Sequence, residues 1–535
     1  MTTDHPVRRV LIVGGGTAGW MAAASLSKLI GRHLDITLVE SDEIGTIGVG
    51  EATIPTFIAL HQLLKIPEAE FLANVQGTIK LGISFERWQT LTKKYIHAFG
   101  TTGQGCWAAG FHHFWNRANR EGFAGDYGLY SPELMAAQAG RFGHLETTPL
   151  NYAYHLDATA YAKYLRTFSE KAGVRRVEGR IDSVKLHASG DIDSVQLVSG
   201  AAIDADLFID CSGFTGLLID KALNTPFDDW GQWLPCDRAI AVQTTSNEAP
   251  IPYTRAIAHG FGWQWKIPLQ HRVGNGLVFS SEFMTDDQAA NLLLSEVTGN
   301  VLTEPRVIRF KTGQRKAHWV RNCVAIGLAS GFIEPMESTS IHLIQRGIIR
   351  LMQLFPSGGI QEGDRSEFNE QMTTEFRHIR DFIIMHYHLT ERTDTEFWRR
   401  NQAMSVPDSL SHRLELFAQS GNVFQGQWDV FGENSWTQVM MGQGLRPAHY
   451  HPIVDMMSDN ELQGFIDHQA QKVQSMLARA PTHSDFLGLL PGPLTLTSTP
   501  KPRPLSPHRE QIRKGWVKSG FPHNLYQFHS KKSHA

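Results

Sequence analysis

The chain has 535 residues, enough to bury a large core in two or three structural layers. Hydrophobic residues make up 41% and charged residues 19%, which is typical of a soluble globular protein, and the net charge of −3 gives no nucleic-acid footprint. The cysteines lack metal-ligand or CxxC spacing, which favours free thiols in the cytoplasm, and no apolar run approaches the ~18 residues that span a bilayer. They are Cys106, Cys211, Cys236 and Cys323.

A glycine-rich turn opens the first predicted element. Residues 9–13 read as a short buried strand, Gly14, Gly16 and Gly19 have the spacing of the dinucleotide fingerprint, and a helix begins at Thr17-Ala18. The first glycine permits a tight turn, and the third lets helix and strand pack closely. The second lets backbone N–H groups approach a pyrophosphate at the positive end of the helix.

A second predicted strand, residues 35–39, delivers Glu40 twenty-one residues after Gly19, where an acid meets ribose hydroxyls. Strand, helix and acid together predict a dinucleotide site. The alternative is a signal peptide, since Arg8-Arg9 precedes an apolar stretch and alanines at 22–24. We reject it, because the glycine turn interrupts the apolar stretch and cleavage would destroy the fingerprint.

The next segment suits a backbone laid against a flat ligand. The loop 44–56 is rich in glycine and hydroxyl side chains and includes Gly50, Ala52 and Thr53. We predict a helical region from residue 55 to about 75, with Lys80 just beyond it. Residues 95–130 are rich in glycine, histidine and aromatics, which favours loops around a pocket.

Later segments repeat the pattern of an apolar strand that ends in small residues. We predict a helix over 152–173 and strands over 175–186 and 192–197. The strand 205–210 leads to Gly213, and the strand 323–326 leads to Leu328. Three such strands predict one parallel sheet that meets a long ligand at its carboxyl ends, which FAD matches better than NAD. Three ordinary strand-to-helix turns are the alternative.

The last part of the chain is predicted to be helical from Ile341 onward. The partition is an FAD-binding and site domain over 1–340, a helical lobe over 341–497 and a basic, proline-containing tail over 498–535. Such a tail is typical of a solvated end rather than a nucleic-acid patch. The predicted helices cover 341–354, 365–389, 395–401, 409–420 and 459–480.

The most specific motif is Trp263-Gln264-Trp265-Lys266-Ile267-Pro268. On a strand, Trp263 and Trp265 point to the same face. They are large core residues or a wall beside the flavin. With GxGxxG upstream, this WxWxIP motif makes the chain resemble the flavin-dependent halogenases of the tryptophan halogenase family, over all but about the last forty residues.

Two further stretches carry the resemblance. Residues 48–53 look like the flavin-side loop of the family, and residues 331–340 look like its halide and active-site loop. The resemblance implies an α/β fold of the flavin monooxygenase type. It also implies a two-component system in which a separate reductase supplies FADH2, and O2 and chloride or bromide yield hypohalous acid. The acid passes through a tunnel to a lysine, and Trp263, Trp265, Ile267 and Pro268 keep the organic substrate from the flavin.

The resemblance assigns chemistry to two residues. Lys80 is the lysine that hydrogen-bonds hypohalous acid or, when neutral, forms a haloamine, and either role benefits from a desolvated site. Alone, a lysine is more often a solvated surface residue. Glu337 matches the glutamate that polarises the acid or takes the ring proton. Alone, it could equally be a helix N-terminal acid.

Halide and substrate residues follow from the same resemblance. Thr339 and Ser340 match the positions whose N–H groups hold the halide, although some members have glycine at the latter. His97 and Phe99 match residues that sandwich the substrate ring, whereas a core histidine is the alternative.

The resemblance to the family breaks down at the residues with which members that use free tryptophan bind its ammonium and carboxylate groups. A Tyr-Tyr pair and a following acid are replaced by Trp436 and Thr437, and no acid follows. We therefore expect weak or no use of free tryptophan and an indole-like or phenolic substrate, with Trp436 beside it.

Two rivals remain: a flavin-dependent aromatic hydroxylase and a flavin-binding, partner-docking protein without turnover. The expected partners are a flavin reductase and a small aromatic substrate, without nucleic acid or membrane, and a homodimer is left open.

Overall fold

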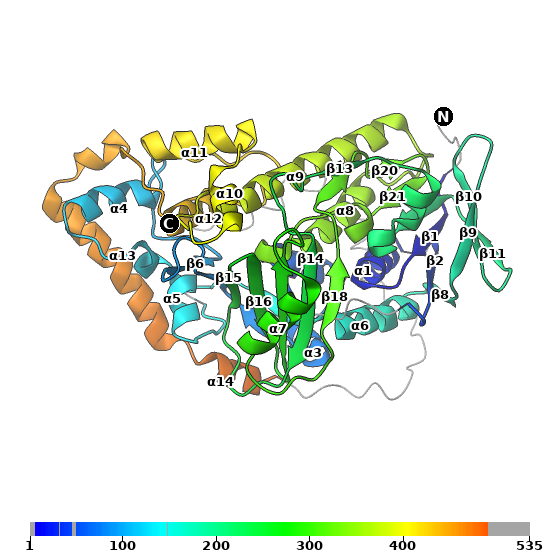
Figure 1. The fold of residues 1–535 in the computed structure, drawn as a ribbon, viewed down its shortest axis with the longest axis horizontal. Helices are drawn as coiled ribbons and strands as arrows, with labels where there is room; N and C mark the ends of the chain where they lie inside the picture. The colour runs from blue at the N-terminus through cyan, green and yellow to red at the C-terminus, as the bar shows by residue number, and fades with distance from the viewer. Residues whose placement is uncertain (1–5, 32, 45–49, 147, 491–535) are drawn as a thin grey trace, which may run out of the picture. The chain divides into compact units, whose positions relative to one another are not determined.

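The computed structural model describes residues 6–31, 33–44, 50–146 and 148–490 (Figure 1). The described residues belong to one compact unit. The predicted tail, 498–535, and residues 48 and 49 of the flavin-side loop lie outside the described residues. Within this unit, the partition at residue 340 stays a proposal.

The dinucleotide fingerprint lies at the centre of a six-stranded sheet. Its strand order is β20-β21-β12-β1-β2-β8, and every neighbouring pair is parallel except β20 with β21. The prediction of one parallel sheet from three apolar strands is confirmed, because β1, β12 and β21 are adjacent. The strands are β1 (Arg9–Val13), β2 (Asp35–Glu40), β8 (Arg175–Glu178), β12 (Leu207–Asp210), β20 (Trp319–Val320) and β21 (Cys323–Ala325).

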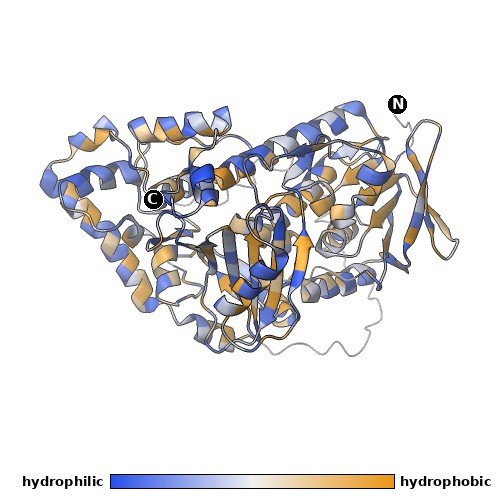
Figure 2. Cartoon of the chain, viewed as in Figure 1, coloured by the Kyte–Doolittle hydropathy of each residue, from blue (hydrophilic) through white to orange (hydrophobic). Residues whose placement is uncertain are grey.

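A seven-stranded sheet carries the tryptophan motif. Its order is β18-β14-β17-β16-β15-β5-β6, and β16 is antiparallel to both neighbours. In Figure 2 its visible strands carry orange, pale and blue stretches, whereas α4 is mostly blue. The strands are β5 (Gly82–Glu86), β6 (Lys94–Ala98), β14 (Arg238–Thr244), β15 (Thr254–His259), β16 (Gly262–Pro268), β17 (Val273–Phe279) and β18 (Arg306–Arg309).

A three-stranded sheet brings the flavin-side segment beside the lysine. In the order β3-β7-β4, both outer strands pair antiparallel with the central one, so the strand of Thr53's loop and the strand of Lys80 flank the same neighbour. The strands are β3 (Gly50–Ala52), β4 (Thr78–Lys80) and β7 (Ala153–Asp157).

Two further three-stranded sheets complete the strands. One contains β9 (Ile181–Leu186), β10 (Ile192–Leu197) and β11 (Ala202–Asp204), and the other contains β13 (Phe227–Asp229), β19 (Gly313–Arg315) and β22 (Gly331–Phe332).

Helices follow the sequence pattern closely in the last third of the chain. The five predicted helices correspond to α8 to α11 and α13, with ends shifted by no more than three residues, but the sequence did not predict α12. The helices are α1 (Thr17–Ser25), α2 (Thr56–Leu64), α3 (Glu68–Val75), α4 (Phe111–Arg120), α5 (Pro132–Gln138), α6 (Ala158–Lys171), α7 (Asp286–Glu296), α8 (Ser340–Gln353), α9 (Glu362–His388), α10 (Glu396–Ala403), α11 (Asp408–Ser420), α12 (Glu433–Gly442), α13 (Asp459–Arg479) and α14 (His483–Gly488).

Two predicted helical segments differ in detail from the structure. The helical region over 55–75 consists of two helices, because Lys65 adopts a left-handed conformation at the end of α2 and Pro67 precedes α3. The helix over 152–173 begins as β7, and α6 starts only after Asp157, whose carboxylate accepts the N–H of Ala160 as an N-cap. The segment 95–130, predicted to be loops, contains the end of β6 and all of α4.

Candidate active site

The glycine turn has the geometry of a ligand cradle. Gly14 adopts φ +109°, and a Cβ there would lie 2.3 Å from the carbonyl oxygen of Cys211. A Cβ on Gly19 would lie 1.8 Å from the carbonyl oxygen of Gly14, so both positions require glycine for packing. A Cβ on Gly16 would meet nothing within 4 Å. The open space at the start of α1 therefore fits the pyrophosphate of a dinucleotide such as FAD.

Other predicted cofactor residues lie on elements around this turn. Thr17 and Ala18 begin α1, Gly213 follows β12 with no atom within 4 Å of its Cβ position, and Leu328 follows β21. Ile341 is buried near the start of α8, which packs against α1. Their contact with FAD stays a prediction.

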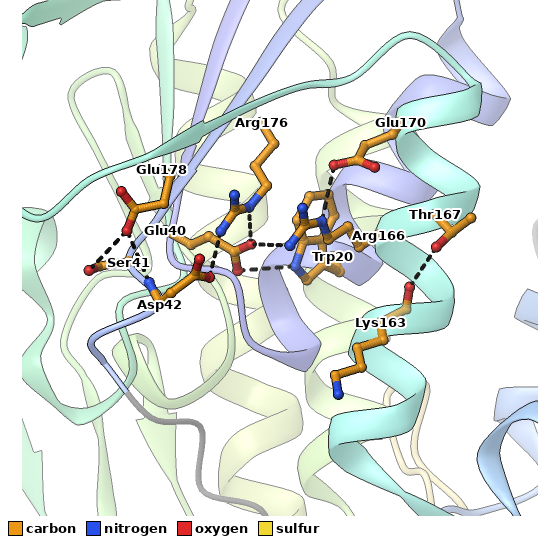
Figure 3. Close-up of polar contacts among 10 residues, drawn as sticks. All are labelled: Trp20, Glu40, Ser41, Asp42, Lys163, Arg166, Thr167, Glu170, Arg176 and Glu178. Atoms are coloured by element: carbon orange, nitrogen blue, oxygen red, sulfur yellow. Dashed lines mark hydrogen bonds and ion pairs between the residues drawn. The ribbon is translucent and has the colours of Figure 1, made fainter.

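Glu40 ends β2 and is already held by neighbouring side chains (Figure 3). Its Oε2 accepts a hydrogen bond from Trp20 Nε1 at 3.3 Å, and its Oε1 accepts one from Arg176 Nε at 2.5 Å. Arg166 lies 3.6 Å from the same oxygen. These contacts orient the carboxylate, which retains lone pairs for the predicted ribose hydroxyls. The sequence analysis did not single out the two arginines.

Lys80 is fully buried at the end of β4. Its Nζ donates to the carbonyl oxygen of Thr53 at 3.1 Å and to Ser338 Oγ at 2.7 Å, and it lies 5.2 Å from the centroid of the Phe99 ring. Burial lowers the pKa of Lys80 from 10.5 to about 7, against the charge of Glu337, which raises it. Near neutral pH the amine therefore exists in both charged and neutral forms.

Glu337 lies between two histidines. Its Oε2 is 2.9 Å from His97 Nδ1, and its Oε1 is 2.9 Å from His386 Nε2. Burial would raise the pKa of Glu337, but the charge of His97 and the hydrogen bonds of both histidines lower it to about 2. His386 lies on α9 and carries no motif signal, so it was not predicted from the sequence.

The predicted halide residues lie where α8 begins. Thr339 precedes the helix and Ser340 is its first residue. The hydroxyl of Thr339 is buried without a partner among the described residues. The first N–H groups of a helix have no intrahelical acceptor, so this end can hold an anion, and halide binding there stays a prediction.

The tryptophan motif forms the strand β16, as predicted, and nearly all of its residues are buried. The rings of Trp263 and Trp265 are 6.2 Å apart, and both are buried. The ring of Trp265 lies on Gly276, where a Cβ would come within 2.0 Å of it. Ile267 contacts Gly50 of the flavin-side strand, and the carbonyl oxygen of Pro268 accepts a hydrogen bond from the Thr78 hydroxyl. The motif therefore connects the flavin-side and lysine strands, whatever its role as a wall.

The predicted substrate residues enclose an aromatic cluster. His97 lies 5.6 Å from the ring of Phe382 and 6.1 Å from that of Phe431. Phe382 stacks on Phe431 at 3.8 Å, and Trp436 of α12 packs edge-on against Phe382 at 4.8 Å. The two phenylalanines connect His97 to Trp436, and the sequence did not single them out.

No group of three or more His, Cys, Asp or Glu side chains that could hold a metal occurs in the described part of the chain. Across the same residues, every helix is too short or too polar to cross a membrane.

Comparison with known proteins identifies the family. The tryptophan halogenase family model matches residues 9–459. Tryptophan 7-halogenase RebH of Lentzea aerocolonigenes is 36% identical, covering 90% of this chain and 98% of its own. The flavin-dependent halogenase Xcc4156 of Xanthomonas campestris is 56% identical, with a TM-score of 0.90 and coverage of 91% of this chain and 99% of its own. BrvH, a flavin-dependent halogenase of Brevundimonas sp. BAL3, is 43% identical, with a TM-score of 0.87 and coverage of 90% of this chain and 99% of its own.

Proposed function

Because the chain belongs to the tryptophan halogenase family and is a flavin-dependent halogenase, we propose that it halogenates an indole-type aromatic ring by means of Lys80 and Glu337. The hydroxylase and the non-catalytic flavin-binding protein are not favoured, since the family and its close relatives are halogenases. The observation that carries the proposal is the buried amine of Lys80, which has a pKa of about 7 and donates a hydrogen bond to Ser338. Ser338 directly follows Glu337, whose buried carboxylate is ionised.

The cofactor site uses the glycine turn and the strands beside it. FAD is held by Gly14, Gly16, Thr17, Ala18, Gly19 and Glu40 at one end, with Gly50, Ala52, Thr53, Gly213, Leu328 and Ile341 around the rest. Bound FADH2 supplies, with O2, the oxidising equivalents that convert chloride or bromide into hypohalous acid. Thr339 and Ser340 hold the halide through the N–H groups at the start of α8.

Lys80 receives the hypohalous acid. The ammonium form donates a hydrogen bond to it, which makes the halogen more electrophilic. The neutral form can take the halogen itself: an N–halogen bond forms, the O–halogen bond breaks, and an amine proton leaves with the oxygen as water. Burial excludes competing water from both routes, and a pKa of about 7 leaves part of the amine charged for the first route and part neutral for the second.

Glu337 completes the reaction at the ring. The ring π electrons form the carbon–halogen bond while the bond that held the halogen breaks: the oxygen of hypohalous acid takes a proton from the Lys80 ammonium and leaves as water, or the protonated haloamine is released as the neutral amine. The Glu337 carboxylate then takes the proton from the halogenated carbon. A carboxylate with a pKa of about 2 is a weak base, but the cationic ring intermediate is a strong acid, so the transfer is downhill. His97 and His386 hold the carboxylate oxygens in place and stabilise the ionised form.

The substrate is an electron-rich ring without the amino acid group of tryptophan. His97, Phe99 and Trp436 bind its faces, and the site lacks the Tyr-Tyr pair and acid that would hold an ammonium and a carboxylate. Trp263, Trp265, Ile267 and Pro268 separate this ring from the flavin. A separate flavin reductase provides FADH2, the enzyme acts in the cytoplasm, and a homodimer remains open.

A product assay tests the proposal. The enzyme receives FAD, a flavin reductase, NADH, O2, indole and bromide or chloride, and products are identified by mass spectrometry. We expect halogenated indole that requires the halide and is lost in Lys80→Ala. Oxygenated indole at every halide concentration would overturn the proposal in favour of a hydroxylase.

A further inference from the structure

Glu334 is a second buried acid on the loop that carries Glu337. Its side chain is fully buried, three residues before Glu337. Its Oε2 accepts two hydrogen bonds, from Trp263 Nε1 at 2.8 Å and from the Tyr387 hydroxyl at 2.7 Å. Its Oε1 is buried without a partner among the described residues. One oxygen therefore joins this loop to β16 and α9.

The two donors are neutral, which makes this arrangement costly. Burial raises the pKa of Glu334 to about 7, and the hydrogen bonds of Tyr387 and Trp263 only partly offset it. A buried carboxyl oxygen without a partner destabilises the folded state relative to one that is hydrogen-bonded. An apolar side chain would avoid this cost, so the contacts made by the other oxygen require an explanation beyond stability.

The opposite end of β16 is attached to the strand of Lys80. The carbonyl oxygen of Pro268 accepts a hydrogen bond from Thr78 Oγ1 at 2.7 Å, and Thr78 begins β4, which ends at Lys80. The strand that starts near Trp263 therefore contacts the loop of Glu337 through Glu334 and the strand of Lys80 through Pro268.

We propose that Glu334 is a positioning residue of the halogenation reaction: through Trp263 it sets the place of β16, and with it the tryptophan wall, relative to the loop that carries Glu337. The inference rests on the proposed function of Lys80 and Glu337. Release of Trp263 lets the wall and the loop move independently, so hypohalous acid is formed but reaches the substrate ring less often. Glu334 acts through other residues and contacts neither substrate nor cofactor in this role.

The test compares Glu334→Gln, Glu334→Ala and Trp263→Phe with the wild type. Glutamine keeps an oxygen that can accept from both donors, alanine removes it, and phenylalanine removes the indole N–H but keeps a ring in the wall. Glu68→Gln is the matched control, because one oxygen of Glu68 likewise accepts two side-chain donors, the hydroxyls of Tyr152 and Tyr154, both at 2.7 Å. The readouts are halogenated indole per FADH2 consumed, kcat and KM for indole, FAD affinity and thermal unfolding.

We expect Glu334→Ala to lower the yield of halogenated indole per FADH2 by about tenfold to a hundredfold, with an unchanged KM, because misplacement by about 1 Å costs rates of this order. Glu334→Gln should recover most of the yield, and Trp263→Phe should lower it even if the alanine variant does not fold. Wild-type yield in Trp263→Phe, or in a folded Glu334→Ala, would overturn the inference. Absence of halogenation by the wild type would instead overturn the proposed function.

Discussion

The substitution Lys80→Met separates stability from activity at the reactive amine. Burial lowers the pKa of Lys80 from 10.5 to about 7, so the folded state binds the proton less tightly than the unfolded chain. A lysine whose pKa is lowered on folding destabilises the folded state fully below the folded pKa, and the cost disappears above the unfolded pKa. At about 1.4 kcal/mol per pKa unit, the cost is about 5 kcal/mol at pH 6 and about 2 kcal/mol at pH 9.

Methionine removes this cost but also the hydrogen bonds to Thr53 and Ser338, each worth about 1 kcal/mol. Lys80→Met should therefore raise the free energy of unfolding by about 3 kcal/mol at pH 6 and leave it nearly unchanged at pH 9. Urea unfolding of variant and wild type at both pH values measures this. Halogenation should be lost. If the free energy of unfolding gained by the substitution were smaller at pH 6 than at pH 9, the pKa of Lys80 would not be lowered in the folded protein.

Three further predictions concern the same site. Glu337→Gln should lower kcat for indole by about 10²-fold, measured as halogenated product, and a wild-type kcat would exclude a role in proton removal. His386→Asn should raise the pKa of Glu337 and so shift the acid limb of the pH–rate profile to higher pH. An unchanged acid limb would show that His386 does not stabilise the ionised form of Glu337. Gly19→Ala should abolish folding or FAD binding, because its Cβ would overlap the carbonyl of Gly14, whereas Gly16→Ala should fold and bind FAD more weakly. Circular dichroism measures folding and flavin fluorescence titration measures FAD binding, and equal effects of the two substitutions would contradict this prediction.

Local sequence signals predicted the parts of the fold that are set locally. The strand–glycine–helix unit, the parallel neighbours of β1 and the C-terminal helices follow from apolar periodicity and turn residues. The end of α2 was missed because a lysine, not a glycine, adopts the left-handed conformation there. The strand β7 was missed because residues 153–157 run without a break into the pattern of α6, and its pairing with β3 and β4 depends on distant segments.

The candidate site was predicted only where motifs carry it. Lys80, Glu337 and the tryptophans are recognised from local patterns, but the contacts of His386 and Tyr387 come from the packing of α9 against the active-site loop. Neither residue stands in a motif, and their separation along the chain from Glu337 and Glu334 hides the contact. Glu334 lies within the loop 331–340, but no local pattern assigns it a role, because burial and hydrogen bonds are properties of the folded chain.

The most direct test of the account measures FADH2 oxidation and halogenated indole together in the wild type and Lys80→Ala. If Lys80 delivers the halogen, the variant should bind FAD and oxidise FADH2 at the wild-type rate while it forms no halogenated indole. Halogenated indole at the wild-type yield in the variant would contradict the account.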